Sequence, residues 1–165
     1  MAKQNQAAYP VTPAVRLLRE KHIQFVPYQY PYREHGGTHH AAEVLNVPEH
    51  TVIKTLVMMT AEHQPLLILM HGDRSVSTRK LARILNVKHV TPCSEEDAHR
   101  YTGYLVGGIS PFGTRTRLPV YAQATIFSLE RIFINGGKHG FLVEINPSDL
   151  HAALSLQEVD VETDE

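Results

Sequence analysis

A lysine in the middle of a β-branched run is the first residue whose setting could support chemistry. Lys54 lies in the stretch VIKTLV, where alternation along a strand sends Val52, Lys54 and Leu56 to one face and Thr55 to the other. Such a lysine commonly packs its stem on apolar neighbours and keeps its amine in water. Alternatively, the amine points into a pocket and holds an anion, such as a phosphate or a developing oxyanion. The strand alone leaves both interpretations open.

Two glycine-rich loops could bind an anion through their main chain. The stretch GYLVGGISPFG spans residues 103–113, and NGGKHG spans residues 135–140. Consecutive glycines let N–H groups line a concavity that holds a phosphate or an oxyanion. Neither loop has the Walker or dinucleotide-binding pattern, and a tight bend or a hairpin turn explains each equally well. The lysine and the two loops form one site only if the fold brings them together.

No recognised motif for a catalytic nucleophile or a metal site accompanies these features. Cys93 has no evident histidine partner, so a structural thiol is favoured over a nucleophile. Ser110 lies in no Gly-x-Ser-x-Gly elbow. His39 and His40 are adjacent, which sends them apart on a helix, and no His-x-x-x-His or Cys-x-x-Cys pair is present. We therefore expect no metal and no cofactor, and an enzyme of this sequence would work without a protein nucleophile.

Composition describes one globular domain. The chain has 165 residues, of which 42% are apolar and 20% charged. Its net charge of −1 argues against a protein that grips long nucleic acid such as DNA unaided. The single cysteine, the lack of an apolar leader and the short longest apolar run, 65–70, predict a cytoplasmic protein with no membrane segment.

The elements expected to position these residues alternate irregularly between helix and strand. Helices are predicted after Thr12 and Pro13, over 38–45, after Ser77 with Leu81, Ile84 and Leu85 as its apolar face, from Ser94 to near Gly103, and from Asn146 to Leu154. Strands are predicted over 26–32, 51–60, 65–71, 118–124, 131–136 and 141–146. The sequence thus predicts a single α/β domain over residues 1–165. Its mixed, partly barrel-like sheet is flanked by helices, and a solvated acidic tail occupies 158–165.

Several of these segments, in their order and spacing, resemble the YbaK/EbsC family, which is related to the editing domain of bacterial prolyl-tRNA synthetases. The segments are TPAVRLLREKHIQF, VIKTLV, TGYLVGGISPFGTRTRLP, FINGGKHG and EINPSDL. The likeness covers about residues 12–154, and its most specific part is the GGISP core of the first glycine-rich loop. Family members are free-standing deacylases that hydrolyse wrongly charged tRNA, most familiarly cysteinyl-tRNA(Pro).

The resemblance implies a set of site residues. Lys54 matches the essential strand lysine, and Gly107 lies in the loop whose backbone faces the aminoacyl ester, so these two are expected to act in catalysis. The positions expected to border the substrate are Tyr30, Thr55, Gly108, Ile109, Ser110, Asn135, Gly136 and Gly137. The implied partner is the 3′ end of aminoacyl-tRNA, with prolyl-tRNA synthetase in a transient complex.

The implied chemistry fits the missing nucleophile. An aminoacyl ester is already activated, so the site need only position it, stabilise its oxyanion and admit water or the thiol of a cysteinyl substrate. Lys54 would hold the ribose-phosphate end or balance the developing charge. The cysteinyl-specific members have a serine at Asn135 and an aspartate at Leu142, so another small amino acid is an open alternative.

Two other function classes use the same features. A binding module would recognise aminoacyl-tRNA or a synthetase without turnover, and a phosphate-binding hydrolase would cleave free esters without tRNA. Modest phosphate contacts, or simply a solvated surface, are expected for Arg74, Arg79, Lys80, Arg83, Arg115, Arg117 and Lys138.

Overall fold

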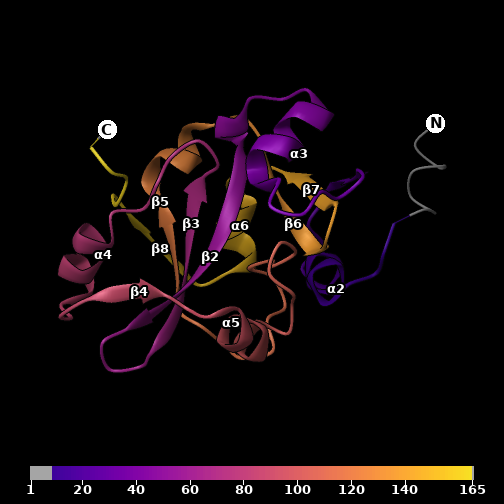
Figure 1. The fold of residues 1–165 in the computed structure, drawn as a ribbon. Coiled ribbons are helices and arrows are strands. Elements are labelled where there is room, and N and C mark those ends of the chain that lie inside the picture. Colours follow the sequence, from indigo (N-terminus) through magenta and orange to yellow (C-terminus); the bar gives the residue numbers. More distant parts are fainter. Residues whose placement is uncertain (1–8, 165) are drawn as a thin grey trace.

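An eight-stranded mixed sheet forms the centre of the computed structural model, which describes residues 9–164 (Figure 1). Its strands are β1 (Val26–Gln29), β2 (Val52–Thr60), β3 (Pro65–His71), β4 (Val90–Pro92), β5 (Val120–Gln123), β6 (Ile132–Lys138), β7 (Phe141–Ile145) and β8 (Leu156–Val159). They are ordered β1-β7-β6-β2-β3-β5-β8, with β4 paired to β2. The pairs β2–β6, β3–β5 and β5–β8 are parallel and the others antiparallel. The edge strands β1 and β8 lie at opposite ends of this order, so the sheet is open.

Helices cover both faces of the sheet. They are α2 (Pro13–Glu20), α3 (Gly37–Leu45), α4 (Thr78–Leu85), α5 (Glu95–Thr102) and α6 (Asp149–Ala153), with short 3₁₀ turns η1 (Glu49–Thr51) and η2 (Ala124–Ser128). The largest core cluster joins α2, α5 and α6 to Ile53 and Val57 of β2. Two smaller clusters join α3 to Val52 and α4 to Met58, on the opposite face. The predicted α/β class, a mixed sheet flanked by helices, is confirmed.

Local sequence signals account for most helix boundaries. The side chains of Thr12, Ser77 and Ser94 accept hydrogen bonds from main-chain N–H groups in the first turns of α2, α4 and α5. Asn46 ends α3 and Gly103 ends α5 in the left-handed conformation. These boundaries agree with the prediction because each depends on residues next to one another in the chain.

The C-terminal segment corrects the prediction of a solvated acidic tail. Leu156–Val159 forms the parallel edge strand β8 beside β5, and Val161 is fully buried. The Nζ of Lys80 donates to the carbonyl of Glu162 and to the Asp164 carboxylate, both at 2.8 Å. Alternating valines, which the acidic neighbours obscure in the sequence, supply the apolar face that attaches this segment.

Other boundaries also differ from expectation. The strand predicted over 26–32 ends at Gln29, and the last helix covers only Asp149–Ala153. Ile84, expected on the buried face of α4, is 42% exposed, whereas Ala82 is buried there. None of the described helices has the length and apolar character needed to cross a membrane.

Candidate functional site

Four adjacent strands contribute one side chain each to a single row on the face that α3 covers. Tyr28 of β1 lies opposite Leu142 of β7, and Leu142 lies opposite Asn135 of β6. The registered pairs of β2 and β6 end one residue before Lys54 and Asn135, which therefore follow side by side. Because side chains alternate along a strand, Lys54 and Asn135 both turn toward α3. The register thus sets the strand lysine beside the first residue of the second glycine-rich loop.

Lys54 is a partly desolvated cation. Its Nζ donates to the carbonyl oxygen of Gly72 at 3.4 Å, in the turn after β3. Burial lowers the pKa of Lys54, whereas the carboxylates of Glu49 and Asp73 oppose this shift by favouring the ammonium form. The amine is therefore neither in open water nor isolated from countercharge.

Thr38 and Glu49 complete the surroundings of this amine. The Thr38 hydroxyl lies 2.8 Å from Glu49 Oε2 and 3.3 Å from the Gly72 carbonyl oxygen. A Cβ at Gly72 would lie 2.6 Å from Thr38 Oγ1 and 2.7 Å from the Val52 carbonyl oxygen. Only glycine lets the turn approach α3 and β2 this closely. Lys54 and Thr38 thus both lie at the Gly72 carbonyl, and Glu49 lies beside the Thr38 hydroxyl.

The two glycine-rich loops converge at the other side of Asn135. Its Nδ2 donates to the Gly107 carbonyl oxygen at 3.4 Å. A Cβ at Gly108 would lie 2.9 Å from the main-chain nitrogen of His139 and from the carbonyl carbon of Lys138. The glycine at position 108 therefore permits direct contact between the two backbones.

The main-chain N–H groups of these loops are less available than expected. The Gly108 N–H donates to the Leu105 carbonyl at 2.8 Å and closes a turn in which Gly107 is exposed at a φ of 94°. The Asn135 side chain accepts from the N–H groups of Gly137 at 2.6 Å and Lys138 at 3.1 Å. An anion-binding nest at Gly108 or Gly137 is thus already filled by the protein itself. Gly107 is the glycine of the first pair that faces solvent.

Tyr30 lies on the same face, two residues beyond Tyr28. Its ring packs with the small cluster that contains Leu142, and its edge meets the ring of His40 at 5.8 Å between centroids. Its main-chain N–H donates to the Gly140 carbonyl at 2.9 Å. Burial raises the pKa of Tyr30, so its hydroxyl stays protonated and can donate a hydrogen bond.

Other expected site residues are not brought to this face by the structure. Thr55 alternates to the opposite face, where its hydroxyl is buried with no hydrogen-bond partner among residues 9–164. Ser110 is fully buried and accepts from the Phe112 N–H, and Ile109 packs against the large core. The carbonyl of Gly136 accepts from Thr12, which links α2 to the second loop. These residues support the loops from behind.

The remaining chemical candidates have structural surroundings. Cys93 is partly buried, and burial raises its pKa, which disfavours the reactive thiolate. His39 pairs with Glu43 and Glu49 at 3.5 Å. Within residues 9–164 no group of three or more His, Cys, Asp or Glu side chains is arranged to hold a metal ion. Arg74 and Lys80 pair with Glu162 and Asp164 of the C-terminal segment, so these two cations are engaged within the protein.

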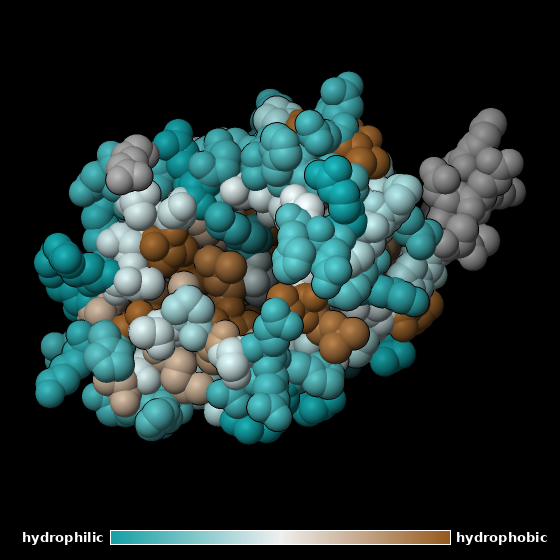
Figure 2. All heavy atoms as spheres, in the orientation of Figure 1, coloured by the Kyte–Doolittle hydropathy of each residue, from teal (hydrophilic) through white to brown (hydrophobic). Residues whose placement is uncertain are grey.

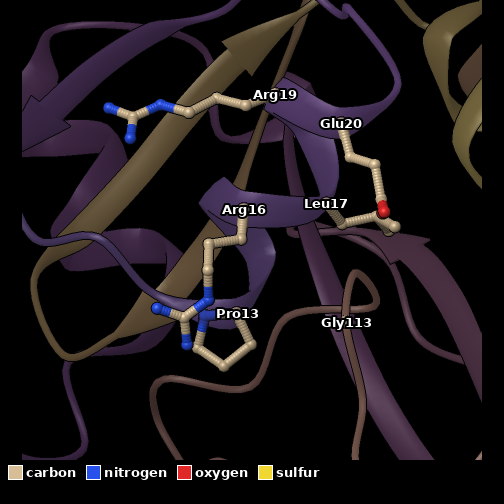
Figure 3. Close-up of a pocket in the computed structure, with 6 residues that line it drawn as sticks. All are labelled: Pro13, Arg16, Leu17, Arg19, Glu20 and Gly113. Carbon is tan, nitrogen blue, oxygen red and sulfur yellow. The ribbon is translucent and has the colours of Figure 1, made fainter.

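The surface of the described part of the molecule is uneven. The space-filling view shows a hollow near the middle of the face seen in Figure 1, with hydrophobic side chains on one side of it (Figure 2). A separate shallow depression of about 630 Å³ lies over α2, lined by Pro13, Arg16, Leu17, Arg19, Glu20 and Gly113 (Figure 3). None of the residues expected to border the substrate lines that depression. The strand register and hydrogen bonds define the candidate site instead.

Sequence reasoning missed Thr38 and Glu49 beside Lys54, and Tyr32 and His139 beside Gly107. Thr38 lies in the first turn of α3 and Glu49 in η1, and the closeness of both elements to β2 depends on tertiary packing. Gly72 was the available signal, because a glycine directly after a buried strand marks a close backbone approach. The pairing of Tyr32 with His139 joins residues far apart in sequence, and no local pattern indicates it.

Chemically, this arrangement can position a small, polarised carbonyl compound. The Lys54 ammonium on β2, the Asn135 amide on β6 and the exposed Gly107 follow one another in space. No cysteine or serine nucleophile lies among them. Such groups can hold an anion or balance a negative charge that develops during a reaction.

Comparisons with known proteins agree with one another. The family model described as the aminoacyl-tRNA editing domain matches residues 36–153. EbsC of Enterococcus faecalis, named as a candidate Cys-tRNA(Pro)/Cys-tRNA(Cys) deacylase, is 26% identical over 155 residues, which cover 93% of this chain and 94% of EbsC. The proline–tRNA ligase of Streptococcus equi subsp. zooepidemicus is 33% identical over 108 residues, covering 65% of this chain but only 17% of the ligase.

Solved structures share the fold. One described as a candidate trans-editing enzyme for prolyl-tRNA synthetase superposes with a TM-score of 0.80 at 22% identity, covering 93% of this chain and 99% of that chain. The crystal structure of a hypothetical protein superposes with a TM-score of 0.84 at 18% identity, covering 92% of this chain and all of the other. At these identities the likeness supports the fold.

Proposed function

The chain belongs to the aminoacyl-tRNA editing domain family, the YbaK/EbsC-like deacylases, and from this premise we propose that it cleaves the ester of mischarged aminoacyl-tRNA in trans. The family expected from the sequence is confirmed, and with it the class of enzyme, an aminoacyl-tRNA deacylase. The chain spans 94% of EbsC but only 17% of the ligase, so the proposal of action in trans rests on the likeness to EbsC.

The observation that carries this proposal is the adjacency of Lys54, Asn135 and Gly107. Lys54 and Asn135 each follow directly after the last registered pair of β2 and β6, Ile53 and Ile134, and Asn135 contacts the Gly107 carbonyl. An ester held along this line would have its terminal ribose at the exposed glycine and its carbonyl near the amide and the ammonium. A Cβ at Gly107 would lie 2.7 Å from the Tyr32 hydroxyl, so only glycine fits at this turn, and its exposed main chain is the part proposed to meet the ribose.

We propose a role for each group in hydrolysis. Water, or the thiol of a cysteinyl substrate, adds to the ester carbonyl carbon and places negative charge on the carbonyl oxygen. The Lys54 ammonium stabilises that charge, and Asn135 orients the ester. The carbon–oxygen bond to the ribose then breaks, and the ribose hydroxyl takes a proton. With water the other product is the free amino acid; with the substrate thiol it is a thiolactone that water then opens.

The preferred substrate is proposed to carry a small amino acid, either cysteine on tRNA(Pro) or another small amino acid on a tRNA. Leu142 is 4% exposed and directly opposite Asn135, so the row contains no carboxylate at this position. An apolar side chain here favours an uncharged, apolar or thiol-bearing substrate side chain over a polar one. A transient complex with prolyl-tRNA synthetase is proposed because the chain is similar to part of a proline–tRNA ligase, and co-purification with the synthetase and tRNA would test it.

A deacylation assay tests the proposal. Cysteinyl-, alanyl- and seryl-tRNA(Pro) are incubated with the native protein, with Lys54→Ala and with the matched surface variant Lys88→Ala. The proposal predicts that the native protein cleaves the ester of at least one of these tRNAs faster than buffer does. Lys54→Ala should lose nearly all of this activity, whereas Lys88→Ala should keep it. No cleavage of any ester by the native protein would overturn the enzymatic function, and cleavage of free amino-acid esters at equal rate would indicate a general esterase.

A further inference from the structure

An apolar surface borders the candidate site at the tip of the first glycine-rich loop. We define this apolar rim as Tyr32, Leu105 and Val106, which are 40%, 61% and 41% exposed. Within residues 9–164, they are three of the seven large hydrophobic side chains that are exposed. Exposed apolar side chains gathered beside a polar site mark a place for a ligand.

The rim is a built structure. The Tyr32 ring stacks on the His139 ring with centroids 4.0 Å apart and planes inclined by 8°. The Nε2 of His139 lies 2.8 Å from the Val106 carbonyl oxygen, and because that oxygen only accepts, Nε2 carries the proton. A Cβ at Gly107 would lie 2.7 Å from the Tyr32 hydroxyl and 3.1 Å from His139 Nε2. The histidine therefore holds the tyrosine and the loop tip together.

The tyrosine stays accessible despite this stacking. His139 occupies one face of the ring and Tyr32 remains 40% exposed, so the opposite face is the one on which a second ring could stack. An aromatic ring fixed in this way is a flat apolar platform whose orientation is already set. It loses little conformational entropy when a second flat ring covers it.

We propose that the open face of Tyr32 stacks on the terminal adenine of the aminoacyl-tRNA, with Leu105 and Val106 covering its edge. This inference rests on the proposed function, because it assumes an ester held at Lys54, Asn135 and Gly107. A base attached to the same ribose must leave the site past Gly107, where the rim lies. Proteins commonly bind splayed single-stranded bases by stacking them on tyrosine or histidine, which requires no hydrogen-bond reading of sequence.

A base-deletion binding experiment tests the proposal. The probe is a short RNA ending in CCA with a non-hydrolysable amide-linked amino acid, and its partner is the same RNA with an abasic terminal nucleotide. Affinities are measured by fluorescence anisotropy for the native protein, Tyr32→Ala, Tyr32→Phe and Ile84→Ala. Ile84 is the matched control, since it is 42% exposed on α4.

The native protein is expected to bind the intact RNA about 5- to 150-fold more tightly than the abasic RNA. Tyr32→Ala should bind both RNAs equally, whereas Tyr32→Phe and Ile84→Ala should keep the preference. Equal binding of both RNAs by the native protein, or an undiminished preference in Tyr32→Ala, overturns the inference even if mischarged tRNA is still cleaved. If the native protein binds the two RNAs equally and Tyr32→Ala loses association with the synthetase, the rim would instead be assigned to a protein partner. Failure to cleave any mischarged tRNA would count against the proposed function separately.

Discussion

Replacing Gly108 with alanine should separate the two glycine-rich loops. The added Cβ would lie 2.9 Å from the backbone of Lys138 and His139, where ordinary contacts are 3.4 Å or longer. Gly108 is not among the glycines with positive φ, so the cost is steric and not conformational. The loops must move apart by about 0.5 Å, and overpacking of this kind costs about 1–3 kcal/mol. For a domain of this size, that lowers the Tm by about 2–12 °C.

The activity should fall further than the stability alone explains. Asn135 contacts Gly107 across the same junction, so the displacement moves two proposed substrate contacts relative to each other. A misplacement approaching 1 Å can cost on the order of 100-fold, so we expect kcat/KM for mischarged tRNA to fall about tenfold or more. The assay is deacylation at 25 °C, with thermal melting of the same samples.

Gly103→Ala is the matched control for this variant. Gly103, at the start of the same loop, has a φ of 81°, and a Cβ there would meet the Arg115 side chain at 3.5 Å and not the backbone of Lys138 and His139. It should lose about 1 kcal/mol of stability through backbone strain and keep its activity. Full activity in Gly108→Ala, or an equal loss of activity in Gly103→Ala, would refute the argument that the loop junction positions the substrate.

Further predictions concern the lysine and the C-terminal segment. Glu49→Gln removes a carboxylate that raises the pKa of Lys54, so the ammonium should lose its proton at lower pH. The alkaline limb of the pH–rate profile should therefore move to lower pH. An unchanged alkaline limb, or the same shift in the control variant of the exposed Glu43, Glu43→Gln, would contradict this. Val161→Ala empties a fully buried position and should cost about 2 kcal/mol, or about 4–8 °C in Tm. The exposed Gln157→Ala should change stability by less than about 0.5 kcal/mol, and equal melting of the two variants would contradict the packed position of this segment.

The parts of the fold that the sequence predicts are those that local chemistry determines. The caps at Thr12, Ser77 and Ser94 and the apolar run of β3 each depend on neighbours in the chain. The packing of Val159 and Val161 was missed because acidic residues surround them, and their burial depends on β5 and α4, which are distant in sequence. A segment so rich in charged residues becomes buried only because the edge of the sheet offers it a strand partner and an apolar surface.

The site was predicted in part for the same reason. Lys54, Asn135 and Gly107 could be singled out by their residue types, and the structure connects them through register and one hydrogen bond. Thr55 and Ser110 lie next to such residues in sequence but turn away or are buried, because adjacency in a strand means opposite faces. Glu49 near Lys54 and His139 beside Tyr32 depend on tertiary contacts that no single-sequence pattern carries.

The most direct test of the central claim is an NMR titration of backbone amides with a non-hydrolysable, amide-linked aminoacyl-adenosine. If Lys54, Asn135 and Gly107 form one site for the aminoacyl end of tRNA, the largest shift changes should occur at residues 54, 107 and 135. Changes confined to Arg16, Leu17 and Gly113, which line the depression over α2, would contradict the claim, as would a spectrum that does not change.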